Sequence, residues 1–308
     1  MNARSDGHHI IFIPKNIMLK NRQSFIFLLI FGLPFATYAQ SEDYKIYDSR
    51  AGQQIELSSI AETFEPADVL FFGERHDDSI AHHLQDQLYG LLLDRYGQVT
   101  LSMEMFETDC QQVVDEYLAG FINERNFVKE SRAWGNYDTD YRPMLERAKA
   151  SEQAVIAANA PRRYVNMVSR LGPESLSNLP KDSRAHLPPL PISTDDDAYR
   201  NAFNDAMGGM AHSGMENVFA AQCTWDASMA YRIYKHWRKH KKEKILHLNG
   251  SFHTDFGLGT VNQLEALNKK IEVMTISSFP ADDFDNPDWA SYSTRGDFII
   301  LTRPAVSR

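Results

Sequence analysis

The sequence predicts an α/β fold: a mainly parallel sheet with helices on both faces plus a small helical insertion domain. Six short apolar runs rich in strand-forming residues recur along the chain, at 68–72, 99–103, 154–158, 244–248, 271–276 and 297–301. Segments with helical periodicity lie between these runs. Alternating strands and helices are typical of a parallel sheet covered on both faces, because parallel strands need crossover connections that pack onto the sheet.

Two apolar stripes predict the first crossover helices. One set of side chains at helical spacing lies between the first two strands, and another follows the second strand. The sets are Ile80, Leu84, Leu88, Leu91 and Leu92, and Val113, Val114, Tyr117 and Leu118. Both stripes are interpreted as core and carry no chemistry.

The alternation stops after about residue 172 and resumes near residue 244. The interval begins with a proline-containing loop, passes an acidic run at 195–197, and then has helical periodicity over about 198–207 and 216–239. We therefore expect residues 173–243 to form a small helical insertion, packed against the sheet within a domain of residues 40–308.

Residues 1–39 have the pattern of a secretory signal peptide. Lys20 and Arg22 precede an apolar run at 25–35, and small residues end the segment. The run is short for a bilayer span, so a permanent anchor is the less favoured alternative. Met18 is a possible true start, because the residues ahead of it fit no part of the pattern.

Export would place the protein in the periplasm or in association with the cell surface. No cysteine lies near the expected cleavage point, which excludes a lipid anchor on a cysteine. Cys110 and Cys223 have two possible states, one disulfide in an oxidising compartment or two buried thiols.

The composition excludes several classes of protein. A chain of 308 residues with 43% hydrophobic content is long enough for one globular domain with a substantial core, and it is neither disordered nor a multi-span membrane protein. Its net charge is -9, from 32 basic and 41 acidic residues. An acidic chain of this kind is a poor binder of nucleic acid.

Polar residues follow the strands of the predicted sheet. Glu74 and His76 come after the first strand, Glu104 after the second, and His253 after the fourth. The carboxyl ends of parallel strands meet at one edge, where ligands bind in open α/β sheets. Two histidines and two carboxylates there are suited to a divalent metal ion, or to a general base with an electrostatic partner.

A purely structural interpretation of these residues remains open. The two glutamates are also suited to capping helices or pairing with Arg75, and the histidines to bonding loop backbone. His82 and His83 lie on the first helix, and His83 is as consistent with a surface or supporting residue as with a ligand.

With these residues in view, the sequence resembles the ChaN-like haem-binding, iron-regulated proteins, within a wider group of Tiki proteases, TraB-like proteins and erythromycin-esterase-like hydrolases. The resemblance rests on six segments in the same order, spanning about residues 68–264. They are "LFFGERHDDSIAHHLQ", "LSMEMFE", "YRPMLERAKA", "VIAANAPRRYVNMVSRLG", "FAAQCTWDASMAY" and "HLNGSFHTDFGLG".

The resemblance implies two different functions. ChaN is a surface lipoprotein of iron supply that binds two haems face to face in a dimer, each iron held by a tyrosine. The wider group implies a hydrolytic or metal site, whose motifs match 73–76, Glu104 and 250–253 in this sequence. The missing lipid-acceptor cysteine puts surface anchoring in doubt.

Tyr164 is the first candidate for a haem ligand. It follows Arg162 and Arg163 directly, and a phenolate with neighbouring cations suits ferric iron and the haem propionates. Ordinary helix packing of Tyr164, with Asn159 as the helix cap, is the alternative.

Tyr199, in the insertion, is the second candidate ligand. Met207 and Met210 offer an adaptable apolar surface near it, for a haem slot, a dimer contact or simple core filling.

The favoured hypothesis is an exported haem-binding protein of an iron-acquisition system, a homodimer with outer-membrane uptake components as possible partners. The alternative is a metal-dependent hydrolase of the esterase or peptidase kind that uses Glu74, His76, Glu104 and His253. A scaffold that keeps these residues but only binds a partner protein is a third possibility.

Overall fold

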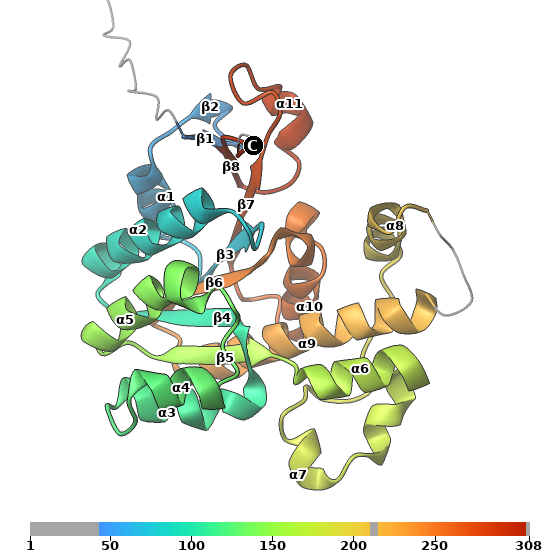
Figure 1. Ribbon diagram of the computed structural model, residues 1–308. Coiled ribbons are helices and arrows are strands. Elements are labelled where there is room, and N and C mark those ends of the chain that lie inside the picture. The colour runs from blue at the N-terminus through green and yellow to red at the C-terminus, as the bar shows by residue number, and fades with distance from the viewer. Residues whose placement is uncertain (1–42, 210–214, 306–308) are drawn as a thin grey trace, which may run out of the picture. The chain divides into compact units, whose positions relative to one another are not determined.

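The computed structural model describes residues 43–209 and 215–305. The predicted signal peptide therefore lies outside the described residues. The described chain contains an eight-stranded sheet, shown in Figure 1. Its strands are β1 (Tyr44–Asp48), β2 (Gln53–Gln54), β3 (Val69–Glu74), β4 (Val99–Glu107), β5 (Val155–Asn159), β6 (Lys244–Gly250), β7 (Val273–Pro280) and β8 (Phe298–Thr302).

The sheet is mainly parallel, which confirms the predicted fold class. The strand order is β2-β1-β8-β7-β3-β6-β4-β5. Strands β3 to β8 pair in parallel, while β1 is antiparallel to both β8 and β2. All six predicted strands are present. The short strands β1 and β2, at one side of the sheet, are a difference from the sequence analysis, which predicted neither.

Helices connect the strands, and short 3-10 or π turns at Thr108–Cys110, Tyr137–Tyr141, Pro173–Asn178, Ser251–His253 and Asp255–Gly257 join them. The helices are α1 (Leu57–Thr63), α2 (Ser79–Tyr96), α3 (Gln111–Leu118), α4 (Glu124–Glu130), α5 (Arg142–Ala150), α6 (Arg162–Leu171), α7 (Lys181–Arg184), α8 (Asp197–Ala206), α9 (Met215–Lys239), α10 (Thr260–Leu267) and α11 (Trp289–Tyr292).

Local sequence explains the limits of α2. Its N-cap is Asp78, whose carboxylate accepts hydrogen bonds from the backbone N–H groups of Ile80 and Ala81 at 3.1 and 3.2 Å. The helix ends at Gly97, where φ is 75°, a left-handed conformation that favours glycine. In α6, by contrast, the N-cap is Pro161 and no side chain caps the helix, so Asn159 does not have the capping role considered above.

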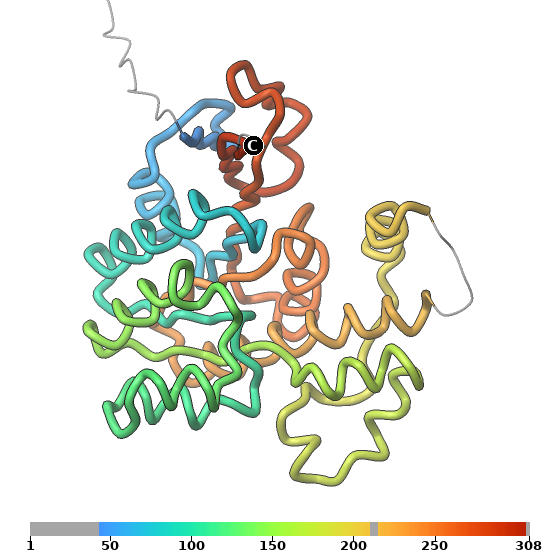
Figure 2. The backbone as a smooth tube through the Cα atoms, viewed as in Figure 1, coloured from blue at the N-terminus to red at the C-terminus, as the bar shows by residue number. Residues whose placement is uncertain are grey.

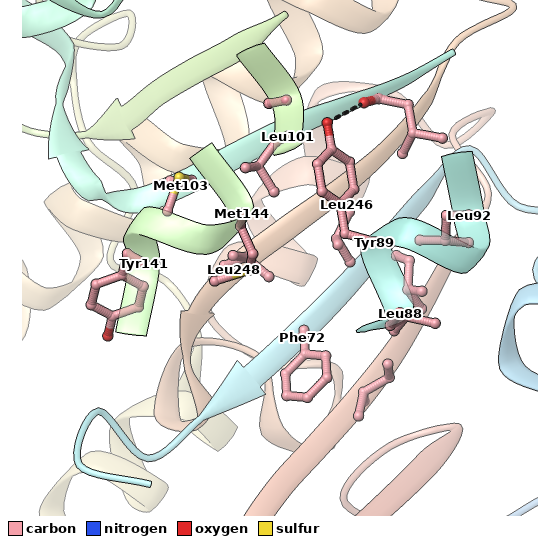
Figure 3. Close-up of a cluster of buried hydrophobic side chains, with 14 of the residues drawn as sticks. Phe72, Leu88, Tyr89, Leu92, Leu101, Met103, Tyr141, Met144, Leu246 and Leu248 are labelled. Atoms are coloured by element: carbon pink, nitrogen blue, oxygen red, sulfur yellow. Dashed lines mark hydrogen bonds between the residues drawn. The ribbon is translucent and has the colours of Figure 1, made fainter. Parts of the chain in front are cut away.

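One face of the sheet packs against α2 and α5, as Figure 3 shows. Phe72, Leu101 and Leu246 from three neighbouring strands are fully buried against side chains of α2. The hydroxyl of Tyr89, on α2, donates a hydrogen bond to the carbonyl of Val99 at 3.0 Å, so this buried polar group is satisfied.

The opposite face packs against α9 and α10. Val69 and Phe71 of β3 point to this side, because successive side chains of a strand face opposite ways. They lie in one cluster with Ile233 and Trp237 of α9 and with Leu264 of α10. Helices therefore cover both faces of the sheet, as predicted.

The chain leaves the sheet after β5, as the backbone trace in Figure 2 shows, and passes through α6, α7 and α8 before α9. The first half of α9 shares a second cluster with α6 and α8, which includes Tyr164, Tyr199, Phe219 and Cys223. Helix α9 thus contacts both the sheet and the helical segment, and a separate insertion at 173–243 stays a prediction.

Two further observations bear on the sequence analysis. Cys110 and Cys223 are both free and buried. Among the described residues, no helix is both long and apolar enough to span a membrane.

Candidate functional site

The strand order places the carboxyl ends of β3, β6 and β4 side by side. Glu74, the last residue of β3, pairs in register with Gly250 of β6. On the other side of β6, the Glu104 carboxylate accepts a hydrogen bond from the backbone N–H of Gly250 at 2.8 Å. Two buried carboxylates therefore flank the end of one strand.

Glu74 and His76 form a direct pair. His76 Nδ1 lies 2.9 Å from Glu74 Oε1, and the histidine side chain is 46% exposed while the carboxylate is fully buried. The edge of the His76 ring also contacts Trp134, with ring centroids 4.9 Å apart. The His76 imidazole is therefore anchored to the buried Glu74 carboxylate and partly exposed to solvent.

Three more side chains hold Glu74 in place. The Tyr141 hydroxyl donates to Glu74 Oε1 at 2.6 Å, the Gln85 amide donates to Oε2, and His82 Nε2 lies 3.4 Å from Oε1. Burial alone would raise the pKa of Glu74, but hydrogen bonds from His76, His82 and Tyr141 outweigh burial and lower this pKa to about 2. The carboxylate is therefore ionised at any physiological pH.

His253 lies between two carboxylates. Its Nδ1 is 2.7 Å from Asp226 Oδ1, and its Nε2 is 3.6 Å from Glu104 Oε1. Burial alone would lower the pKa of His253, but the charges of Glu104 and Asp226 raise it to about 9. Thr260 and Tyr199 donate further hydrogen bonds to Asp226, at 2.8 and 2.9 Å. His253 is therefore a buried imidazolium in a carboxylate clamp.

The Glu74–His76 pair and the His253 clamp meet at Gly250. A Cβ atom on Gly250 would lie 3.0 Å from both Cε1 and Nε2 of His76. A Cβ atom on Gly73 would lie 2.7 Å from the Thr254 hydroxyl. Glycine at these two positions allows the close approach of the strand ends to the histidine and to the following loop.

The structure brings all four residues singled out at the strand ends into one region. The four side chains do not place one ligand atom each within 4.8 Å of one another. A different group of residues in the described chain meets this condition. A single ion bound by all four would therefore require side-chain movement. The sequence analysis did not name Asp226, Tyr141 or Gln85 as site residues. His83 is exposed and bonds Gln87.

Tyr164 lies in the first turn of α6 beside Arg163. The Arg163 guanidinium donates a hydrogen bond to the phenol oxygen at 3.2 Å and lies over the ring, 4.3 Å from its centroid. Asp109 holds the same guanidinium through an ion pair. Arg162 is exposed. The phenol oxygen thus has a cation beside it, as the sequence suggested.

Tyr199 has the opposite surroundings. Its hydroxyl donates to Asp226 at 2.9 Å, and its ring stacks on Phe252. Burial and the negative charge of Asp226 raise the pKa of Tyr199 far above its ordinary value. Met207 is partly exposed beyond the end of α8, and Met210 lies outside the described residues.

This arrangement defines a class of protein: an α/β protein whose parallel sheet gathers two histidine–carboxylate groups at its carboxyl edge. The chain belongs to the family described as "Haem-binding uptake, Tiki superfamily, ChaN", which it matches over residues 60–264. The matched range includes Glu74, His76, Glu104 and His253. It confirms the family resemblance drawn from the six sequence segments.

Two solved structures are similar to the chain. The structure titled "Cofacial heme binding to ChaN of Campylobacter jejuni" has a TM-score of 0.64 and 16% identity, covering 86% of this chain and 98% of that one. A mutant of the erythromycin esterase EreC in its open conformation has a TM-score of 0.46 and 11% identity, covering 86% and 84%. The first similarity shows the fold. No curated protein sequence matches the chain.

Proposed function

We propose that this protein is exported and binds ferric haem for iron or haem uptake, with Tyr164 as the ligand of the iron. Membership of a haem-binding uptake family supports haem as the cofactor. Cofacial haem binding in the structurally similar Campylobacter jejuni protein agrees with it. The choice of ligand comes from the surroundings of the two candidate tyrosines.

The contrast between Tyr164 and Tyr199 carries this choice. Ferric iron takes a tyrosine as phenolate, so the phenol must lose its proton. A guanidinium lies 3.2 Å from the Tyr164 oxygen and stabilises a negative charge there. The carboxylate of Asp226 lies 2.9 Å from the Tyr199 oxygen and opposes that charge.

The arginines beside Tyr164 suit the propionates of a haem. The Tyr164 side chain is buried, but Arg163, which lies over its ring, is 50% exposed and contacts Asp109 and the phenol. A shift of Arg163 would open the oxygen to the iron. Arg162 and Arg163 would then be within the same helical turn as the ligand, where guanidinium groups suit propionates.

Replacing Tyr164 by phenylalanine is expected to abolish the charge-transfer band of a ferric tyrosinate and to weaken haem binding about tenfold or more, because the iron loses its protein ligand. Titration of the purified protein with haemin, followed by visible absorption, measures both effects. Tyr199→Phe is the matched control and should retain the band.

The opposite result, a band lost in Tyr199→Phe and kept in Tyr164→Phe, would contradict the ligand assignment. Equal and full binding by both variants would contradict tyrosine ligation altogether.

The proposal includes a homodimer. A haem held at the surface of α6 exposes an apolar face, and a second copy would cover it. The proposal also includes export by residues 1–39 and a periplasmic or cell-surface location. Contact with outer-membrane uptake components completes it. Dependence of sedimentation on haem loading tests the dimer, because a haem-bridged pair should form only with haemin present.

Hydrolysis with the Glu74–His76 pair is a second candidate function. Glu74 accepts the Nδ1 proton of His76, which leaves Nε2 as the acceptor for a proton from water. The hydrogen bond that His76 donates to Glu74 and the charge of Glu104 outweigh burial and raise the pKa of His76. Glu104 and His253 would position the reacting group opposite the pair, and a divalent metal is not required for this step.

If this second function operates, His76→Ala should lower ester or peptide hydrolysis by about 10²–10⁴-fold, the usual contribution of a general base. The control is His83→Ala, which removes an exposed histidine of α2. Activity that survives in His76→Ala would exclude this role.

A further inference from the structure

A second polar cluster lies at the opposite edge of the sheet from Glu74 and Glu104. It consists of His236 in the last turn of α9, His240 directly after that helix, and Glu243 just before β6. One ligand atom of each residue lies within 4.8 Å of the others. Within residues 43–209 and 215–305, no other histidine, cysteine or carboxylate group meets this condition. The haem proposal uses none of the three residues.

The geometry of the cluster is that of a chelate. The backbone N–H of His240 donates to the carbonyl of His236 at 3.0 Å, so His240 continues the last turn of α9 and lies on the same side as His236. Their rings stack with centroids 4.4 Å apart and an angle of 13°. His236 Nε2 lies 2.9 Å from one carboxylate oxygen of Glu243, and His240 Nδ1 lies 2.9 Å from the other. Both imidazoles thus direct a nitrogen toward one carboxylate.

Neighbouring groups fix this arrangement before any ion arrives. The Thr100 hydroxyl, on β4, donates to Glu243 at 3.0 Å, and the backbone N–H of Glu243 donates to the carbonyl of His240 at 3.0 Å. The Thr100 hydroxyl also lies 2.9 Å from His236 Nε2, so one side chain of β4 contacts two members of the cluster.

We propose that His236, His240 and Glu243 form a binding site for one divalent transition metal ion, of which Zn²⁺ is the best match. Two imidazoles and one carboxylate are a ligand set that zinc uses, with an open fourth position. Ligands of a tetrahedral zinc ion lie about 3.3 Å apart for bonds of about 2.0–2.1 Å. The separations of 2.9 Å between the histidine nitrogens and the carboxylate are already close to this value.

The charges around the cluster set the character of the site. Three cations, Arg232, Lys235 and Lys239, and one carboxylate, Asp115, line a cavity of about 270 Å³ together with the two histidines. These cations oppose an incoming metal ion, so the affinity should be moderate rather than that of a structural zinc site. The same cations favour a water-derived hydroxide or another small anion as the fourth ligand.

The test is a calorimetric titration of haem-free, chelator-treated protein with Zn²⁺. The wild type should bind one equivalent, and His240→Ala should weaken the affinity about tenfold or more through loss of one ligand. His240 is a suitable target because its side chain is 45% exposed and can be removed without opening the core. Glu243→Gln, which keeps the size of the side chain and removes its charge, should weaken binding as well.

His83→Ala is the matched control, since it removes an exposed histidine from another helix, and its affinity should equal that of the wild type. Co²⁺ provides a second measurement, because its four-coordinate absorption should appear in the wild type and in His83→Ala but not in a His236→Ala/His240→Ala variant. Unchanged zinc affinity in that double variant, or no saturable binding by the wild type, would overturn the proposal. Haemin plays no part in these titrations, so their outcome is separate from that of the haem proposal.

Discussion

Replacing Asp226 by alanine is expected to lower the free energy of unfolding by about 3–5 kcal/mol, the range for breaking a buried ion pair by removing one partner. The imidazolium of His253 is buried and would keep Glu104 as its carboxylate partner, 3.6 Å away. Tyr199 and Thr260 would each lose the acceptor of a buried hydrogen bond. Denaturant unfolding of the two proteins at pH 7 measures the difference.

The control for this prediction is an ion pair at the surface. Lys129 and Glu130 are 2.9 Å apart with side chains 80% and 58% exposed. Glu130→Gln should change the free energy of unfolding by about 0–1 kcal/mol, because solvent screens exposed pairs. A loss in Asp226→Ala as small as the one in Glu130→Gln would show that His253 is not charged in the folded protein.

The sheet could be predicted because its inner strands are buried on both faces. Such strands are continuous runs of apolar and β-branched residues, as in β3 and β6, and the pattern is visible without any partner strand. Strand β1 is only partly buried, and β2 has two residues. Strand β1 depends on pairing with β8, which is more than 240 residues away in the sequence, and β2 in turn pairs with β1. The patterns of these two strands are too weak to predict them.

The strand-end residues could be predicted for a related reason. Parallel pairing fixes where each strand ends, so Glu74, Glu104 and the segment of His253 had to lie at one edge. Asp226 could not be found in this way, because it projects from α9 and reaches His253 across 27 positions of sequence. A carboxylate in the buried stripe of a helix, between Cys223 and Ala230, was nevertheless a usable signal, since an unpaired charge there would be costly.

The two tyrosines also show that local sequence does not reveal contacts between residues distant in the chain. The cation beside Tyr164 is its sequence neighbour, so local sequence was enough to suggest it. The anion beside Tyr199 comes from Asp226, which approaches only after α8 packs on α9. Local sequence therefore ranked Tyr164 first, but the reason against Tyr199 exists only in the tertiary structure.

The stability of the folded protein is expected to fall by about 3 kcal/mol between pH 6.5 and pH 9, because His253 holds its proton longer in the folded state. Its pKa is about 9 when folded, against 6.5 as the ordinary value that applies on unfolding. Below pH 6.5 both states are protonated and the full stabilisation is present. As the pH rises toward 9 the unfolded state alone loses the proton, so folding loses this contribution.

Glu74 makes the free energy of unfolding depend on pH in the acid range, where stability falls as the pH is lowered. Its pKa is about 2 when folded against an ordinary 4.5, so its contribution is present above pH 4.5 and is lost as the pH falls toward 2. His247, with a pKa of about 3 when folded, adds to this loss below pH 6.5, because only the unfolded state takes up its proton there. Burial raises the pKa of Asp255 to about 6, which partly offsets the acid loss between pH 3.8 and pH 6. We therefore expect greatest stability near pH 6.5.

Denaturant unfolding at pH 6.5 and pH 9 tests the alkaline loss, with Asp226→Asn/His253→Gln as the comparison. The double variant removes the proton-binding group together with its nearest carboxylate, so its free energy of unfolding should change clearly less over this range than that of the wild type. Equal changes in the two proteins would assign the alkaline loss to other groups, foremost His76 and His82, whose pKa values are also raised by Glu74 against the effect of burial. A wild type with constant stability over the range would mean that the carboxylates of Glu104 and Asp226 do not hold a proton on His253, which would then be a neutral imidazole.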